Sequence, residues 1–486
     1  MNGPALPLAE GHVLELVAAY AARTPGSKRL AAEARPTLAD KSSIGMRFTA
    51  ETKEICYPLA VERADGAFLW DVDGHRYTDI LLGLGLNLFG HNPEFVREAI
   101  AAQLQRGFAL GAQHPQVGAL AQRVAELTGH ERVCFSNTGT EAVMTAIRIA
   151  RAATGRPCIV TFTNSYHGHH DAALMRAPLA EYARKRLIER AQGRALLAPL
   201  AALAARFGSS RAVPAFPGVS QAAAREVLVL EYGHARSLDL IRRRAGDIAA
   251  VLVEPVQSRC TELQPREFLH ALRALTARTG SALVFDEMVS GFRVHPAGAQ
   301  GLFGLQADIA TYSKIAGGGL PLSVIAGSAR WLDRIDGGVW RYGDDSAPQV
   351  PTTFFAGTFT KHPLALAAAL AMLDRLQAEG PALQDGLNRR TAALVERLNA
   401  FTAQAGVPVQ FTHFGSFFTV AASRSALSER ARLLLSYHLL LRGVHLRVGD
   451  AGGFLCTAHG DAEIDHIAAA FRDSLAALRD GGLFNP

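Results

Sequence analysis

The sequence predicts an α/β protein built on a mostly parallel β-sheet, followed by a smaller α+β portion. From about residue 116 onward, short apolar runs alternate with stretches of helical periodicity. The runs include residues 132–135, 158–162, 226–230, 248–253 and 282–285. Because such strands are apolar on both faces, they are typical of a parallel sheet covered by helices on each side. After Pro363, an alanine-rich helix leads into the second portion, which ends near residue 480.

The N-terminal region has its own regular elements. Residues 10–22 place apolar side chains at helical spacing, which predicts an amphipathic helix. Residues 67–80 alternate polar and apolar side chains around an Asp-Gly turn, which predicts a β-hairpin. We therefore expect an N-terminal segment, 1–90, that contributes to the small domain. A large domain over 91–355 and a C-terminal small domain over 356–486 complete the predicted organisation.

Composition limits the classes of protein to consider. The 486 residues, 49% of them hydrophobic, suffice for one large and one smaller domain. A membrane-spanning helix needs an uncharged apolar run of about 18 residues, and the sequence contains no such run. The N-terminus lacks the features of a signal peptide. The five cysteines are scattered, without a pairing or metal-ligand spacing. We expect a cytoplasmic protein with no membrane association and no bound metal.

The positive charge is concentrated in one segment. Residues 176–211 hold eight basic and two acidic side chains, a net +6, which equals the formal net charge of the chain. Such a local patch steers an acidic partner rather than defining a fold. We therefore expect no nucleic-acid partner, and we predict a helical basic insertion at about 175–210.

Lys314 lies in the segment Thr311-Tyr-Ser-Lys314, which a glycine-rich apolar stretch follows at once. A lysine amine among apolar groups has its charged form disfavoured, so its pKa falls and it becomes a nucleophile toward aldehydes. Asp286 ends the apolar run 282–285, where a carboxylate suits the pyridine nitrogen of pyridoxal phosphate. Alone, the two residues are better explained as a surface lysine and a turn former. The motifs around them favour a Schiff-base site.

Two Gly-Thr pairs precede predicted helices. Gly139 and Thr140 follow a strand end and open an alanine-rich helix, where free backbone N–H groups bind phosphate. Thr358 stands shortly before Pro363, and proline suits the first turn of a helix. Each pair alone is also explained as a simple helix cap.

Polar residues follow two further strands. Tyr166 lies in a loop after the run 158–162 and could stack on a pyridine face, although packing explains it equally. Glu254 ends the run 248–253 and could be a turn residue or a site carboxylate. Three histidines follow Tyr166, but no further ligand set with metal spacing accompanies them, so we reject a zinc site.

In this order and spacing the motifs resemble those of the class III aminotransferases, which depend on pyridoxal 5'-phosphate. Within that class the chain resembles the glutamate-1-semialdehyde aminomutase branch. It resembles still more the aminotransferases of polyketide and peptide natural-product biosynthesis. The resemblance covers roughly residues 45–475 and includes Trp70-Asp-Val-Asp-Gly74, Phe89-Gly-His-Asn92-Pro, Tyr166-His-Gly168, Arg341-Tyr-Gly-Asp-Asp345 and Thr457-Ala-His459.

The resemblance implies fold type I, with a mostly parallel seven-stranded sheet in the large domain and a smaller α+β domain. It also implies a homodimer whose active sites are shared between the subunits. Lys314 would hold the cofactor and move a proton between substrate and cofactor. Asp286 would keep the pyridine nitrogen protonated, and Glu254 would position the substrate or cofactor. The remaining implied cofactor contacts are Gly139, Thr140, Tyr166, His167, Met288 and, from the other subunit, Thr358.

Substrate residues are less sharply marked. At Gly83 and Leu84 the aminomutase carries a serine and a tryptophan, so this chain has a roomier and more apolar stretch. Asn87 follows the same stretch. A carboxylate-binding arginine would be Arg47 or Arg447, although Arg47 is equally consistent with a surface ion pair. These departures favour an aldehyde, a ketone or a thioester-linked acyl substrate over a free dicarboxylate.

The predicted function is amino transfer from an amino acid donor to a carbonyl acceptor, by a ping-pong mechanism through Lys314. The acceptor could be a biosynthetic intermediate bound to an acyl or peptidyl carrier protein, for which the basic insertion at 175–210 would be a docking surface. A 2,1-aminomutase is the alternative. A non-catalytic regulator with a DNA-binding module is disfavoured, because only about 40 residues precede the resemblance.

Overall fold

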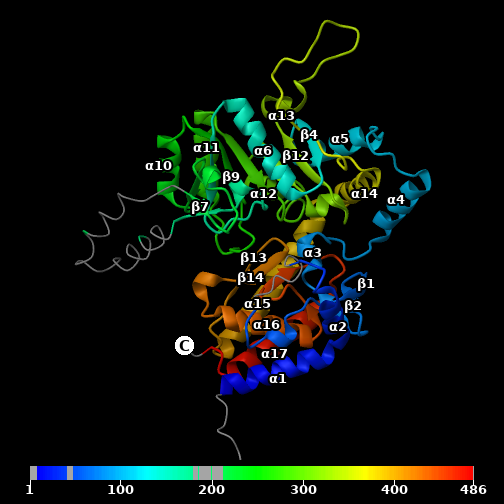
Figure 1. Cartoon of the computed structure of the whole chain (residues 1–486), viewed down its shortest axis with the longest axis vertical. Coiled ribbons are helices and arrows are strands. Elements are labelled where there is room, and N and C mark those ends of the chain that lie inside the picture. The colour runs from blue at the N-terminus through cyan, green and yellow to red at the C-terminus, as the bar shows by residue number, and fades with distance from the viewer. Residues whose placement is uncertain (1–7, 41–47, 179–183, 185–198, 200–211, 485–486) are drawn as a thin grey trace, which may run out of the picture. The chain divides into compact units, whose positions relative to one another are not determined.

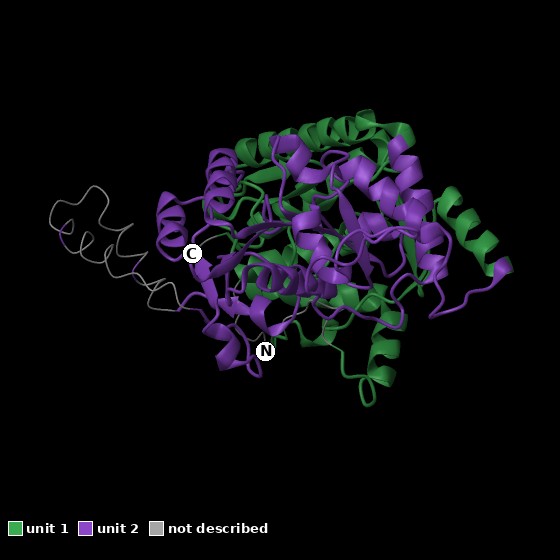
Figure 2. Ribbon diagram, turned by 90° about the horizontal axis from the view of Figure 1, so that it is seen from above, with its two compact units in different colours: residues 1–105, 260–262, 378–486 green, residues 106–259, 263–377 purple. Residues whose placement is uncertain are grey.

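The computed structural model describes residues 8–40, 48–178, 184, 199 and 212–484. The chain forms two compact units, coloured separately in Figure 2. Unit 1 comprises residues 1–105, 260–262 and 378–486, and unit 2 comprises residues 106–259 and 263–377. Arg47 and nearly all of the predicted basic insertion lie outside the described residues. None of the helices that the structure describes is long and apolar enough to span a membrane.

A seven-stranded sheet forms the centre of unit 2, with strand order β4-β12-β11-β10-β9-β5-β8 (Figure 1). Its strands are β4 (Arg132–Ser136), β5 (Cys158–Phe162), β8 (Val227–Leu230), β9 (Ile248–Val253), β10 (Ala282–Asp286), β11 (Ile309–Tyr312) and β12 (Ser323–Gly327). Only β12 runs antiparallel to its neighbours. Every residue of β5, β8, β9, β10, β11 and β12 is buried. The predicted parallel sheet with apolar strands is confirmed.

Helix α6 (Gly139–Thr154) packs on this sheet against β9, β11 and β12 (Figure 1). Its apolar face, which includes Val143 and Ile147, joins a core cluster with Leu252, Val284 and other strand residues. The remaining elements assigned wholly or largely to unit 2 are α5 (Gln116–Thr128), α9 (Gln221–Ala224), α10 (Ala235–Arg243), α11 (Arg266–Thr279), α12 (Gly298–Phe303), α13 (Ala329–Asp336), α14 (Pro363–Glu379), β6 (Met175–Arg176) and β7 (Val213–Pro214).

Unit 1 contains two small sheets. One has the order β1-β2-β3-β15 and the other β13-β14-β16. The strands are β1 (Val61–Asp65), β2 (Phe68–Asp71), β3 (Arg76–Asp79), β13 (Phe411–Phe414), β14 (Phe417–Val420), β15 (Val444–His445) and β16 (Gly452–Phe454). The predicted hairpin is β2 and β3, which pair antiparallel with Leu69 opposite Tyr77.

Helices of unit 1 enclose an apolar core. They are α1 (Leu8–Arg23), α2 (Pro25–Ala34), α3 (Leu82–Gly85), α4 (Glu94–Arg106), α15 (Pro381–Gln404), α16 (Glu429–Leu441) and α17 (Asp461–Asp480). The predicted N-terminal helix is α1, whose Val13, Leu16, Val17 and Tyr20 are buried at the predicted spacing. These four side chains join residues of α15, α16 and α17 in one cluster, so the first and last parts of the chain share a core.

A pair of histidines joins α1 to α16 in this unit. His438 Nε2 lies 2.9 Å from His12 Nε2, and Arg442 Nη1 donates to His438 Nδ1 at 3.1 Å. Because Nδ1 accepts from a guanidinium, His438 must be neutral and donate from Nε2. Burial, Arg442 and His12 lower the pKa of His438 to about 3, well below the ordinary value of about 6.5.

Acid should therefore destabilise unit 1 through His438. Below a pH of about 6.5 the unfolded chain takes up a proton that the folded chain rejects, so this contribution to stability is lost as the pH falls. We expect the free energy of unfolding to drop by up to about 1.4 kcal/mol per pH unit from this residue. Denaturant titrations between pH 7.5 and 5 should show a flatter decline for His438→Gln. The exposed His466→Gln should keep the parental slope, and equal slopes for all three proteins would contradict the assignment.

Candidate active site

Four neighbouring strands of the central sheet place site residues at one edge. In sheet order β11-β10-β9-β5, Lys314 follows β11, Asp286 ends β10, Glu254 follows β9 and His167 lies in the loop after β5. The four strands are parallel, so their carboxyl ends lie together. This edge is the usual ligand site of an open α/β sheet.

Lys314 begins the short 3-10 helix Lys314–Gly317, in the connection between β11 and β12. The connection is held on both sides, because Ser313 donates its hydroxyl to the Leu322 carbonyl at 2.9 Å and lies 2.8 Å from the Ser323 hydroxyl. Gly318 has φ +60, and a Cβ there would lie 2.6 Å from the Ala368 carbonyl oxygen. Close backbone packing thus requires a glycine at position 318.

The amine of Lys314 lies in an environment that disfavours its charged form. Burial lowers its pKa, Arg293 lowers it further, and the carboxylates of Asp286 and Glu254 oppose the shift. A lowered pKa increases the share of neutral amine, which is the nucleophilic form. This outcome agrees with the environment that the sequence predicted for this lysine.

Asp286 and His167 form a buried side-chain contact. His167 Nδ1 lies 2.7 Å from Asp286 Oδ2, and the Met288 N–H donates to Asp286 Oδ1 at 3.1 Å. These two partners fix the carboxylate at the end of β10. The contact gives His167 a definite task that the sequence did not reveal, namely to orient Asp286.

Glu254 is a second buried carboxylate at the same edge. Its Oε2 accepts the Tyr166 N–H at 2.9 Å, and its Oε1 accepts the Ser258 hydroxyl at 3.1 Å. Burial raises the pKa of Glu254, against the opposing effects of His167 and the backbone donors. Because it accepts the Tyr166 N–H, Glu254 also holds the loop that carries the Tyr166 ring.

The start of α6 forms a close cradle. Thr138 caps the helix by accepting the Glu141 N–H, which leaves the first-turn N–H groups of Gly139 and Thr140 for an anion. A Cβ on Gly139 would lie 2.9 Å from Met288 Sδ, and one on Gly168 would lie 2.6 Å from Thr140 Oγ1. The chain therefore approaches this helix end more closely than larger residues allow.

These groups fit pyridoxal 5'-phosphate. The helix end suits its phosphate, the Asp286 carboxylate its pyridine nitrogen and the Lys314 amine its aldehyde. The Tyr166 ring is half exposed, and Arg259 lies 5.6 Å from its centroid. His167 Nε2 is a buried nitrogen for which the described residues supply no hydrogen-bond partner. This nitrogen can therefore form a hydrogen bond with a bound molecule.

The remaining predicted residues belong to other segments of the chain. Thr358 is exposed in unit 2, between β12 and α14. Leu84, Asn87 and Arg447 belong to unit 1. Leu84 has φ +63 and is exposed, and Asn87 Nδ2 lies 3.0 Å from His91 Nδ1. Arg447 forms a two-bond ion pair with Asp450, at 3.0 and 2.9 Å, so its guanidinium already has a carboxylate partner.

Sequence reasoning missed the task of Glu287. Its carboxylate accepts the N–H groups of Ala299 and Gln300, both at 2.9 Å, and the Ser290 hydroxyl. Burial raises the pKa of Glu287 to about 7. These bonds tie the end of β10 to α12, directly beside Asp286. Apart from the position of Asp286 at the end of the apolar run, the sequence pattern does not separate Glu287 from its neighbour.

Comparison with known proteins agrees with this geometry. The class III aminotransferase family model matches residues 49–448. The chain is 35% identical over 434 residues to the glutamate-1-semialdehyde 2,1-aminomutase of Desulfitobacterium hafniense, covering 87% of this chain and 91% of the relative. It is 39% identical over 364 residues to that of Deinococcus deserti, covering 74% and 75%.

Solved structures share the fold. An omega-transaminase from Sphaerobacter thermophilus is 28% identical, with a TM-score of 0.78 over 94% of this chain and 99% of that one. A β-phenylalanine aminotransferase from Variovorax paradoxus is also 28% identical, with a TM-score of 0.78 over 97% and 98%. A glutamate-1-semialdehyde aminomutase from Pseudomonas aeruginosa, solved with PMP, has a TM-score of 0.80 at 23% identity over 97% and 98%.

The cradle at α6 can be tested with two matched glycines. Gly168 and Gly218 both have φ +87, but a Cβ on Gly218 meets nothing within 4 Å. Gly168→Ala and Gly218→Ala should therefore share the backbone strain and differ in the clash with Thr140. We expect Gly168→Ala to weaken cofactor binding at least tenfold, about 1.4 kcal/mol, as measured by cofactor release. Equal retention in both variants would argue against a phosphate site at this helix end.

Proposed function

The chain belongs to the class III aminotransferases, which depend on pyridoxal 5'-phosphate, and from that premise we propose a specific activity. It transfers an amino group from an amino acid donor to an aldehyde or ketone of a small-molecule acceptor. The observation that carries this proposal is the arrangement of Lys314 beside the Asp286 and Glu254 carboxylates at one buried edge of the sheet.

The cofactor, when bound, supplies an aldehyde and an electron sink. The chain supplies the groups that control protons. Lys314 has a lowered pKa, so it can both accept and return a proton at the substrate carbon. Asp286, oriented by His167 at 2.7 Å, provides a fixed negative charge for the pyridine nitrogen. Glu254 and its hydrogen bond to Tyr166 hold the aromatic ring in place.

Two features favour transfer to a separate acceptor. Gly83 and Leu84 make an apolar, left-handed turn, with φ +62 and +63, where the aminomutase branch carries polar and aromatic side chains. Arg447 is occupied by Asp450, so a free carboxylate would have to displace an existing partner. Both features suit an uncharged carbonyl acceptor.

A glutamate-1-semialdehyde 2,1-aminomutase is the second candidate. The specific observation in its favour is the name of the relatives that are 35 to 39% identical to this chain. An aminomutase returns the amino group to the same carbon skeleton and needs no separate donor. The two activities use the same lysine and carboxylates, so the site residues alone cannot separate them.

A homodimer is part of the proposal. Thr358 and the aromatic residues Tyr342, Phe354 and Phe359 are exposed in unit 2, as expected for a stretch that a second subunit covers. Delivery of the acceptor by a carrier protein, a role in natural-product biosynthesis and a cytoplasmic location stay predictions.

A labelled donor distinguishes the two activities. With a panel of ¹⁵N-labelled amino acids and a panel of aldehydes and ketones, we expect the label in an amine product whose carbon skeleton comes from the acceptor. Conversion of glutamate 1-semialdehyde to 5-aminolevulinate without any donor would favour the aminomutase. Absence of both reactions in protein that retains its cofactor would contradict amino transfer as proposed.

Lys314 can be identified chemically among the six lysines of the chain. Borohydride reduction of the holoenzyme should fix the cofactor to the peptide that contains Lys314, as detected by mass spectrometry. Lys314→Ala should abolish the labelling and lower turnover by about two to four orders of magnitude, the typical contribution of a general acid–base group. Lys28→Ala, which removes an exposed lysine paired with Glu54, should change neither. Labelling at another lysine would overturn the assignment.

A further inference from the structure

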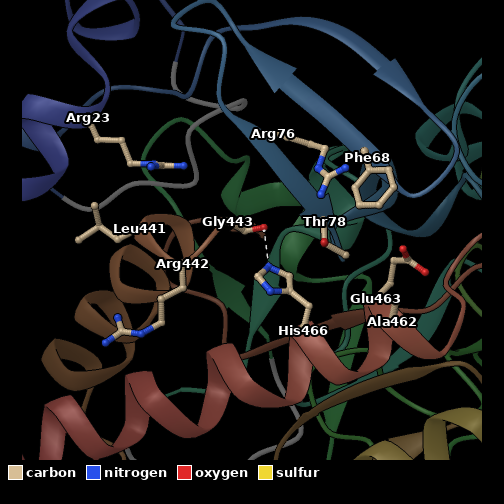
Figure 3. Close-up of a pocket in the computed structure, with 10 residues that line it drawn as sticks. All are labelled: Arg23, Phe68, Arg76, Thr78, Leu441, Arg442, Gly443, Ala462, Glu463 and His466. Atoms are coloured by element: carbon tan, nitrogen blue, oxygen red, sulfur yellow. Dashed lines mark hydrogen bonds between the residues drawn. The ribbon is translucent and has the colours of Figure 1, made fainter.

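Unit 1 contains a cavity of about 500 Å³ that the proposed reaction does not use. It is bordered by residues of α1, β2, β3, α17 and the end of α16 (Figure 3). None of the residues that we place in the active site lines it. The lining residues are Arg23, Phe68, Arg76, Thr78, Leu441, Arg442, Gly443, Ala462, Glu463 and His466.

Positive charge exceeds negative charge around the cavity. The charged side chains that line it are three arginines, Arg23, Arg76 and Arg442, and one carboxylate, that of Glu463. Within the described part of the chain, none of these three guanidinium groups has an acidic side chain within ion-pair distance. Glu463 accepts the Gly460 N–H at 2.8 Å and so caps α17. Guanidinium groups without a carboxylate partner are suited to bind an anion.

The side chains divide into two groups by direction. Figure 3 shows Arg23 and Arg76 directed into the space above His466, whereas the guanidinium of Arg442 turns away from it. Arg442 is engaged with His438 and the Asp473 carbonyl. The Nε of Arg23 is buried and lacks a hydrogen-bond partner.

Arg76 is also held in place for binding. Its guanidinium lies 4.5 Å from the centroid of the Phe68 ring, which restricts the side chain without using its N–H donors. His466 is positioned by its Nε2, 3.3 Å from the Gly443 carbonyl. Thr78 adds a hydroxyl between these groups (Figure 3).

We propose that this cavity binds a small organic phosphate, a phosphate monoester that also carries hydroxyl groups. Two guanidinium groups and a hydroxyl match the several acceptor oxygens of a phosphate better than a single carboxylate does. Glu463, on the other side of the cavity, accepts hydrogen bonds from the hydroxyl groups of the ligand. The volume exceeds that of the phosphate group and leaves room for a short carbon chain.

Glycerol 3-phosphate is a suitable probe, because it has no carbonyl group that could react at Lys314. Titration calorimetry should be done on holoenzyme saturated with cofactor, so that the cofactor's own phosphate site is filled. We expect saturable binding of glycerol 3-phosphate, weaker binding of inorganic phosphate and no binding of glycerol. Arg23→Gln with Arg76→Gln should weaken binding at least tenfold.

Arg63→Gln is the matched control. Arg63 belongs to the same sheet and stacks on Trp70 at 3.6 Å, but it does not line the cavity. The Arg63→Gln variant should bind glycerol 3-phosphate as the parent protein does. Arg76→Lys keeps the positive charge and should retain part of the affinity. Such retention would show that the double variant loses affinity because it lacks the charges, and not because it misfolds.

Three results would overturn the proposal. They are the absence of saturable binding to the parent, an equal loss of binding in Arg63→Gln, and succinate binding as tightly as glycerol 3-phosphate. The last result would identify a dicarboxylate site instead. Amino transfer is measured separately from this binding, so failure of one proposal leaves the other intact.

Discussion

The active site depends on keeping one amine and two carboxylates close together in a buried environment. Burial lowers the pKa of Lys314 and raises the pKa of Glu254, so it disfavours the charged form of both groups. The carboxylates of Asp286 and Glu254 oppose the shift at Lys314, whereas His167 and two backbone donors oppose the shift at Glu254. His167, Ser258 and backbone N–H groups then fix the two carboxylates by hydrogen bonds. The reactivity of the lysine is thus a property of the whole edge of the sheet.

The order of the strands makes this concentration of charge possible. Four neighbouring parallel strands end at the same edge. Each strand contributes one residue, so residues from different parts of the sequence come together there. The start of α6 directly follows β4, a strand of the same sheet, and its first-turn N–H groups are suited to bind an anion. The candidate phosphate site and the environment of Lys314 therefore follow from the same architecture, a largely apolar sheet whose candidate site residues stand where its strands end.

The sequence predicted the parts that have local signals. Apolar runs located the strands, with β5 and β9 at the predicted residues, and the apolar, glycine-rich sequence around Lys314 indicated the lowered pKa of its amine. Contacts between distant segments had no such signal. The pairing of His167 with Asp286 joins residues 119 positions apart, and Arg259 above Tyr166 requires the fold itself. Substrate residues were the least predictable, because the ion pair of Arg447 with Asp450 depends on a turn geometry that spacing does not encode.

The connection between β11 and β12 has one more consequence. Because these strands are antiparallel neighbours, with Tyr312 opposite Val324, residues 313–322 form a reversal whose two ends are fixed by the sheet. Insertions are normally tolerated where a loop can bulge into solvent, but here Ile315 and Ala316 are buried and Gly318 touches α14. An added or deleted residue would rotate or displace the amine rather than extend a loop. The length of this segment, as much as its composition, therefore determines where the amine of Lys314 lies relative to the sheet.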